Sequence, residues 1–158
     1  MIRRTLYAVA VLALMVGLVA AAEPIKVALK DFKMKPKNEG SPEELLGYNE
    51  GEAKLYFYIH GTGSADIKVP EDGEYTLTIE ASCDEANKEK AKIKVMIGEE
   101  VITKEFELKQ VEAKAYEFTA KLKKGSPKLS IEFLNDLFKE GEYDMNLYIH
   151  SVKLEKKK

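Results

Sequence analysis

Residues 74–81, EYTLTIEA, alternate between apolar and polar side chains over their whole length. The apolar positions are Tyr75, Leu77, Ile79 and Ala81, and glutamates and threonines stand between them. Successive side chains of a β-strand point to opposite faces of a sheet, so a period of two predicts a strand with one buried and one solvated face. This stretch therefore predicts one strand of a half-buried sheet.

The same alternation recurs along the chain, which predicts further strands. It covers residues 92–97, 116–122 and 129–133, and further candidates are residues 25–32, 54–60, 65–69 and 146–154. Turn-forming residues separate these runs, as in PEDG at 70–73 and KGSP at 124–127. One short helix is expected at 42–46, after Ser41. Short strands at this spacing predict an all-β protein, built as an antiparallel β-sandwich.

The first 22 residues have the order of a secretory signal peptide. Arg3 and Arg4 precede an apolar run from 6 to 20, and Ala20 and Ala22 fit the A-x-A pattern of signal peptidase sites. We therefore expect cleavage after residue 22, a secreted or periplasmic protein without membrane attachment, and a single domain over residues 23–158. The alternative is an uncleaved anchor, because the 18 residues from 5 to 22 are near the shortest length that spans a bilayer.

Charge and cysteine content narrow the possible partners. Two of the 25 basic residues are the arginines of residues 1–22, so residues 23–158 carry 23 lysines against 27 acids, a formal charge of −4. Lysine binds phosphate less well than arginine, and net negative charge repels a phosphate backbone, so nucleic acid is not an expected partner. Cys83 is the only cysteine, so no disulfide can form within the chain. We expect a monomer stabilised by its core or by a bound ion.

Side chains suited to catalysis are few. His60 and His150 are the only histidines, and neither belongs to a metal-ligand spacing such as H-E-x-x-H. Residues 60–64, HGTGS, lack the helices between strands that an α/β-hydrolase would need, and we interpret them as a turn. Acidic residues are too numerous for any pair to indicate glycoside hydrolysis. The sequence therefore predicts no enzyme, with a hydrolase using surface carboxylates as a minor alternative.

Residues 131–150 give the clearest indication of a binding site. We expect one strand to end at Asn135 and Asp136, and a second strand to begin at Asp144 and Asn146 after a loop. If the second strand returns antiparallel beside the first, these four side chains converge. Ca²⁺ prefers six to eight oxygen ligands, and such a loop supplies about half of them. The alternative is that these side chains only form hydrogen bonds within the turn.

The stretch FLNDLFKEGEYDMNLYIHSVKL, residues 133–154, resembles the closing motif of the calcium-dependent xylan-binding carbohydrate-binding modules. In that family a strand ending in N-D is followed by a loop and by D-x-N-L-Y-[VI]-x-x-[IV]. Residues 67–82 and 114–136 are also similar to that family's strands and turns, so the resemblance covers roughly residues 48–154. It implies a galactose-binding-like jelly roll whose loop calcium binds neighbouring hydroxyls of a polysaccharide such as xylan.

The resemblance also implies roles for individual residues. Asp136 would be a side-chain ligand of the calcium, with Asn146 and Asp144 across the loop, and a backbone carbonyl of Tyr143 or Met145 would complete the protein's share. Asn135, beside Asp136, is a further candidate ligand. The family's first strand usually carries acids around E-A-E for a second calcium, whereas residues 27–32 read VALKDF, and His150 stands where an acid is common. We therefore expect one calcium rather than two.

A sugar site usually offers an aromatic face to the C–H surface of a pyranose, and the chain has no tryptophan. Phe138 and Tyr143 lie in the loop and are candidates, whereas Tyr56 and Tyr58 share one parity of a strand and could equally be core residues. The sequence thus predicts a secreted, non-catalytic module that binds a xylan-like polysaccharide through a loop calcium. The alternative is a structural or protein-interaction β-sandwich that binds no sugar.

Overall fold

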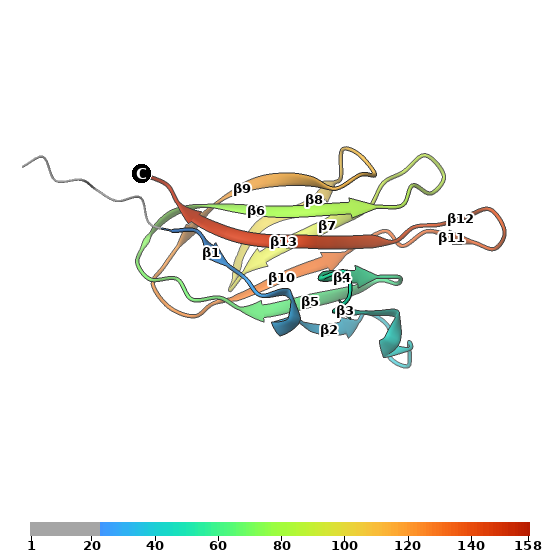
Figure 1. Ribbon diagram of the computed structural model, residues 1–158, viewed down its shortest axis with the longest axis horizontal. Coiled ribbons are helices and arrows are strands. Elements are labelled where there is room, and N and C mark those ends of the chain that lie inside the picture. Colours follow the sequence, from blue (N-terminus) through green and yellow to red (C-terminus); the bar gives the residue numbers. More distant parts are fainter. Residues whose placement is uncertain (1–22) are drawn as a thin grey trace, which may run out of the picture.

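The computed structural model of the protein describes residues 23–158, so the expected signal peptide lies outside the described residues. Two antiparallel sheets face each other (Figure 1). The first sheet has the order β3 (Leu46–Asn49), β4 (Lys54–Phe57), β13 (Leu147–Lys156), β6 (Gly73–Cys83) and β9 (Lys114–Leu122), and β1 (Ile25–Lys26) also pairs with β13. The second has the order β2 (Lys33–Pro36), β5 (Gly61–Asp66), β10 (Lys128–Phe133), β7 (Lys92–Ile97) and β8 (Glu100–Glu107). The predicted all-β sandwich is confirmed.

The apolar parity of each central strand forms the core between the sheets. Tyr75, Leu77, Ile79 and Ala81 of β6 are all buried, as the alternation over residues 74–81 predicts. Opposite them the second sheet contributes the buried side chains of Ile93, Val95, Leu129, Ile131 and Phe133. Each fully buried Leu, Ile or Phe side chain stabilises the fold by about 1.5–3 kcal/mol. The face of each central strand that is polar in sequence is therefore the face outside the sandwich.

The glycine-rich stretch interpreted above as a turn is instead strand β5, which lies between β2 and β10. A Cβ on Gly61 would lie 2.8 Å from Leu46 Cδ2 and 2.9 Å from the Lys35 carbonyl oxygen. A Cβ on Gly63 would lie 2.9 Å from the Met34 sulfur. The glycines are therefore needed because neighbouring chain segments approach β5 closely, and not because the backbone turns there.

Other elements also differ from expectation. The strand β8 was not predicted, because it pairs only with β7 and is exposed over much of its length, so its sequence lacks a clean alternation. The expected helix at 42–46 is only the 3₁₀ turn η2 (Glu43–Leu45). The strand expected over 25–32 is wrong beyond β1, because the 3₁₀ turn η1 covers Leu29–Asp31. Among the described residues, no helix is long and apolar enough to cross a membrane.

The strands on either side of the predicted loop do not pair with each other. Strand β10 belongs to the second sheet and β13 to the first, so the antiparallel return proposed from the sequence is wrong. The loop instead folds into a small hairpin of β11 (Phe138–Lys139) and β12 (Tyr143–Asp144), which projects from one end of the sandwich (Figure 1). Residues 134–146 thus carry the chain from one sheet to the other at that end.

Candidate calcium and saccharide site

A pocket of about 630 Å³ lies at the hairpin end of the sandwich, and we call it the site pocket. Its lining comes from the η2 turn, the segment after β4, the link after β10, the hairpin and the start of β13. The lining residues are Leu45, Tyr58, Ile59, Asp136, Phe138, Asp144, Asn146 and Tyr148. Three of the predicted metal ligands, Asp136, Asp144 and Asn146, are therefore brought together, although the chain route differs from the predicted one.

Two oxygen atoms of this pocket are buried without a hydrogen-bond partner, Asp136 Oδ1 and Asn146 Oδ1. The Asn146 side chain belongs to a residue that is only 9% exposed. An unpaired buried polar atom costs about 1–3 kcal/mol, so native structures usually supply it with a water molecule or an ion. Carboxylate and amide oxygens are the ligands that Ca²⁺ prefers, and both atoms therefore suit a bound calcium.

The number of carboxylates in this pocket is small. Within residues 23–158, no three His, Cys, Asp or Glu side chains gather closely enough to hold a metal ion by themselves. Asp136 and Asp144 supply two carboxylates, and the third side-chain oxygen is the Asn146 amide. Such a set fits a hard cation that completes its coordination with carbonyl, water or hydroxyl oxygens, and it does not fit a zinc site built from His and Cys.

A residue that the sequence interpretation missed, Asp84, determines how Asn146 is oriented. The side-chain nitrogen of Asn146 donates to Asp84 Oδ2 at 2.9 Å, and the Asp84 backbone N–H donates to the backbone carbonyl of Asn146 at 3.0 Å. An ionised carboxylate only accepts hydrogen bonds, so the nitrogen must face Asp84 and the amide oxygen must face the other way. Asp84 follows β6, and no local pattern in the sequence links it to Asn146, 62 residues later.

Asp136 is held by its backbone. Its N–H donates to Nε2 of His60 at 2.8 Å, so the neutral His60 ring carries its proton on Nδ1. Burial raises the pKa of the Asp136 carboxyl, and the neighbouring Asp144 charge raises it further. A cation beside this carboxylate would favour the ionised form and counteract the effect of burial.

The remaining predicted ligands take other places. Asn135 joins β10 to β7, because its Oδ1 accepts from the Lys92 N–H at 2.6 Å and its Nδ2 donates to the Lys90 carbonyl at 3.0 Å. The Tyr143 side chain packs against the core, and the Met145 side chain is fully buried. Neither side chain lines the site pocket, so only their backbone carbonyls, the atoms named as ligands above, stay as candidates.

Aromatic side chains surround the mouth of the site pocket. Phe138 on the hairpin is 68% exposed and Tyr58 is 41% exposed, and both line the pocket. Tyr56 is outside the lining, but its ring centroid lies 4.9 Å from that of Tyr58. Tyr148 lines the pocket although it was not predicted, and its ring packs edge-on against Tyr58 at 6.2 Å. Its parity, opposite to buried Leu147 and Ile149, could have indicated this exposure.

Tyr148 also joins the polar side of the site. Its hydroxyl donates to Asp84 Oδ2 at 3.3 Å, and the Lys54 ammonium lies 4.2 Å from the centre of its ring. Burial and the Asp84 charge raise the pKa of the Tyr148 hydroxyl, so it stays a neutral donor. Oriented oxygen atoms and exposed aromatic rings at one mouth form a surface suited to a polyhydroxylated, ring-shaped ligand.

Residues 76–158, just over half of the chain, match the family model described as Ca-dependent carbohydrate-binding module, xylan-binding (CBM60). The chain belongs to this family. The matched range contains Asp84 and every predicted ligand of the site pocket, and the resemblance found in residues 133–154 is confirmed. The protein is thus a carbohydrate-binding module by family, and no curated protein sequence matches it significantly.

Several solved structures with similar folds are named as carbohydrate-binding modules. A family 35 module from Clostridium thermocellum superposes with a TM-score of 0.58 at 11% identity, over 84% of this chain and 98% of that one. The C-terminal CBM6 of LamC, a laminarinase from Zobellia galactanivorans, gives 0.52 at 12% identity, over 85% and 100%. The mannan binding module from Man5C gives 0.54 at 15% identity, over 83% and 97%. At such low identities these comparisons establish the sandwich fold of the module alone.

Proposed function

We propose that this module binds a xylan-like polysaccharide through a Ca²⁺ ion held in the site pocket by Asp136, Asp144 and Asn146. The observation that carries the proposal is the pair of buried, unpartnered oxygens, Asp136 Oδ1 and Asn146 Oδ1. When bound, the ion would take sugar hydroxyls at the coordination positions that the protein leaves open. The description of the family model supports both the ion and the polysaccharide.

Each residue of the site pocket would then have a separate task. Asp136 and Asp144 supply the negative charge that attracts the ion, and Asn146 supplies a neutral oxygen. Asp84 holds the Asn146 amide in the orientation that leaves this oxygen available. Tyr58, Phe138 and Tyr148 offer aromatic surface to the C–H face of the sugar, which orients the chain without contributing ligands.

We further propose that the protein acts by binding alone, and that it does so outside the cytoplasm after removal of residues 1–22. The order of charged, apolar and small residues in that segment supports export. The family, whose members are named as binding modules, supports a non-catalytic role. The competing proposal is a structural or protein-interaction domain that has kept the fold and does not bind sugar.

Affinity electrophoresis tests the proposed function. The protein is run through gels containing neutral arabinoxylan, with either millimolar CaCl₂ or EDTA, beside Asp136→Ala and Asn146→Ala variants. Asp66→Ala is the matched control, since Asp66 is an exposed carboxylate of β5 outside the site pocket. We expect arabinoxylan to retard the wild type and Asp66→Ala only with calcium, and to retard neither site variant. Calcium binding without any retardation would favour the interaction-domain function.

A further inference from the structure

A second pocket, of about 460 Å³, lies on the edge of strand β13, and we call it the β13 notch. Two strands pair with the same edge of β13, with β4 opposite Leu147–Ile149 and β1 opposite Lys153–Leu154. The Val152 carbonyl still accepts from the Val27 N–H at 3.0 Å, so residues 150 and 151 are the ones left between the two pairings. Beyond β1, the η1 turn closes the notch from the other side.

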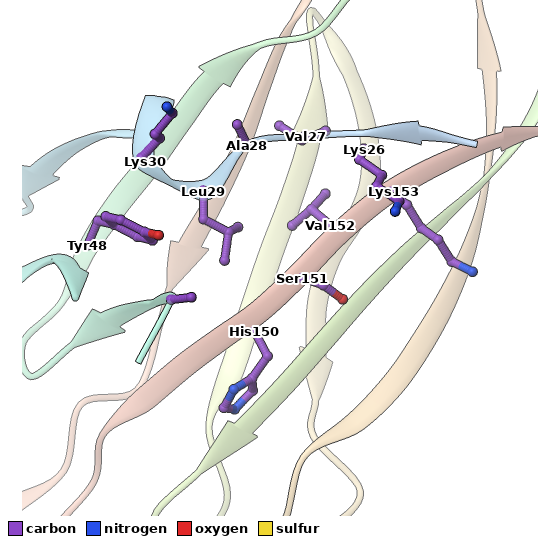
Figure 2. A pocket seen from close by; sticks show the side chains of 11 residues that line it. Lys26, Val27, Ala28, Leu29, Lys30, Tyr48, His150, Ser151, Val152 and Lys153 are labelled. Atoms are coloured by element: carbon purple, nitrogen blue, oxygen red, sulfur yellow. The ribbon is translucent and has the colours of Figure 1, made fainter. Parts of the chain in front are cut away.

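The floor of the β13 notch is apolar. Figure 2 shows the side chains of Leu29 and Val152 pointing into the space between η1 and β13, with the Tyr48 ring at one end. Leu29 is 9% exposed and Val152 is 2% exposed, so both belong to the core. An apolar floor bordered by an aromatic ring fits the C–H face of a sugar ring.

Two lysines stand at the other end of the β13 notch (Figure 2). Lys26 and Lys153 are directly opposite each other in the antiparallel pairing of β1 with β13, so their side chains share one face of the sheet. Like charges in directly opposite positions destabilise a pair of strands. No ion pair within residues 23–158 engages Lys26 or Lys153. The fold thus holds two uncompensated cations side by side.

The other polar groups of the β13 notch do not neutralise these cations. The Ser151 hydroxyl donates to Oε2 of Glu80 at 3.0 Å, and His150 Nε2 lies 2.8 Å from the Ser82 hydroxyl. Burial lowers the pKa of His150, so its ring stays neutral near pH 7. The residues lining the notch include no Asp or Glu. The Glu80 and Glu52 carboxylates lie near enough to His150 to affect its pKa, so a ligand carboxylate would meet its positive charge at Lys26 and Lys153.

We propose that the β13 notch is a second saccharide site, which binds a uronic acid unit of a polysaccharide. Lys26 and Lys153 hold the carboxylate, and the sugar ring lies in the notch against its more exposed apolar lining, Val27, Ala28 and the Tyr48 ring. In taking uronic-acid-substituted xylan as the occupant, this inference rests on the proposed function. Both sites lie along β13, and the five residue-to-residue steps from Tyr148 to Lys153 span roughly 17 Å at about 3.4 Å per step, a length that a short stretch of one polysaccharide chain covers.

The test separates the two sites by removing calcium and by removing the carboxylates. The protein is run through gels of glucuronoxylan and of the same glucuronoxylan after chemical reduction of its carboxyl groups, in EDTA and in CaCl₂. The test variant is Lys26→Gln/Lys153→Gln. The control variant is Lys114→Gln/Lys128→Gln, which removes two exposed lysines that lie outside the notch.

In EDTA we expect glucuronoxylan, but not its reduced form, to retard the wild type and the control variant. The test variant should bind glucuronoxylan about tenfold more weakly, as expected for a lost hydrogen-bonded charge contact. Its melting temperature should equal or exceed that of the wild type, because the repulsion between the two lysines is gone. Equal losses in both variants, or no retardation of the wild type in EDTA, would overturn the proposal.

The gel of reduced xylan in calcium reports on the first site by itself. If the reduced polymer retards the test variant as it does the wild type, the calcium site works and the lysines are not part of it. If the reduced polymer retards no variant while glucuronoxylan still retards the wild type in EDTA, the proposed calcium-dependent function is wrong, and the proposal of a uronic acid site in the β13 notch is supported. A lower melting temperature of the test variant would contradict the assigned repulsion.

Discussion

The Asn146 amide nitrogen, just before β13, and the Asp84 carboxylate, just after β6, lie 2.9 Å apart and form the shortest contact that orients the Asn146 amide. The same nitrogen makes a longer contact of 3.5 Å to Asp144 Oδ2, and without these acceptors the two ends of the amide are nearly equivalent in shape. With the Asp84 contact, the oxygen stays on the side away from Asp84, where it has no partner of its own. A residue that touches no ion can in this way set the affinity of the site.

Asp84→Asn therefore tests orientation more than charge. The new amide can donate to Asn146 as well as accept from it, so the Asn146 oxygen is no longer held toward the site pocket. We expect calcium affinity, measured by isothermal titration calorimetry, to fall about tenfold, comparable to the loss seen when partners of metal ligands are changed. Asp66→Asn removes one exposed carboxylate elsewhere and should bind calcium as the wild type does. Equal affinities of Asp84→Asn and wild type would show that Asp84 has no orienting role.

Asp136→Ala should lower thermal stability in calcium and not in EDTA. In EDTA the substitution removes a carboxyl with an unpaired buried oxygen, so the melting temperature should stay level or rise. In calcium the wild type gains about 2.7 kcal/mol at a free ion concentration about 100 times the dissociation constant, and the variant does not. Scanning calorimetry of both proteins in both buffers checks this. If the wild-type melting temperature is the same with and without calcium, the proposed calcium site is contradicted.

Phe138→Ala should separate sugar binding from calcium binding. Phe138 is 68% exposed on the hairpin and contributes no oxygen, so its loss should leave calcium affinity unchanged. Binding of xylohexaose should weaken about tenfold, as expected when an aromatic platform contributing roughly 1–1.5 kcal/mol is lost. Val101→Ala, an exposed apolar residue of β8, is the control for surface truncation. Parallel losses of calcium and sugar affinity would mean that Phe138 supports the hairpin rather than the ligand.

Gly61→Ala should destabilise the fold although Gly61 lies far from any turn. A Cβ there would meet Leu46 at 2.8 Å and the Lys35 carbonyl oxygen at 2.9 Å, and backbone cannot move aside easily. Forcing this contact should lower the free energy of unfolding by about 1–3 kcal/mol, as measured by urea denaturation. Gly51→Ala is the control, because its Cβ would have its nearest neighbour at 3.5 Å. If the two variants are similarly stable, close packing does not explain the glycine in β5.

Sequence periodicity predicted the strands with one buried face well, because burial acts on single residues. The alternation in β6, β7, β9 and β10 reflects one face in the core, and the structure places those residues there. The edge strand β8 lacks a buried face, so no period identified it. Glycine in β5 was read as a turn because its real cause, close approach of Leu46 and the Lys35 backbone, depends on distant segments.

The site was predictable only in part, for a similar reason. Asp136, Asp144 and Asn146 lie within eleven residues of one another, and a single chain reversal brings them together whichever strands pair. Tyr58 lines the site pocket from another part of the fold, and Asp84 and His60 bond to Asn146 and Asp136 from far away in the sequence. Only the register of β1 against β13 shows that Lys26 and Lys153 lie opposite each other.

Calorimetric titration of xylohexaose into the protein, in millimolar calcium and again in EDTA, tests the central claim most directly. The ligand is neutral, so the lysines of the β13 notch have no carboxylate to bind and only the site pocket is probed. The account predicts measurable binding in calcium, none in EDTA, and recovery when calcium is restored to the same sample. Equal binding in both buffers, or none in calcium while the ion itself binds, would contradict it.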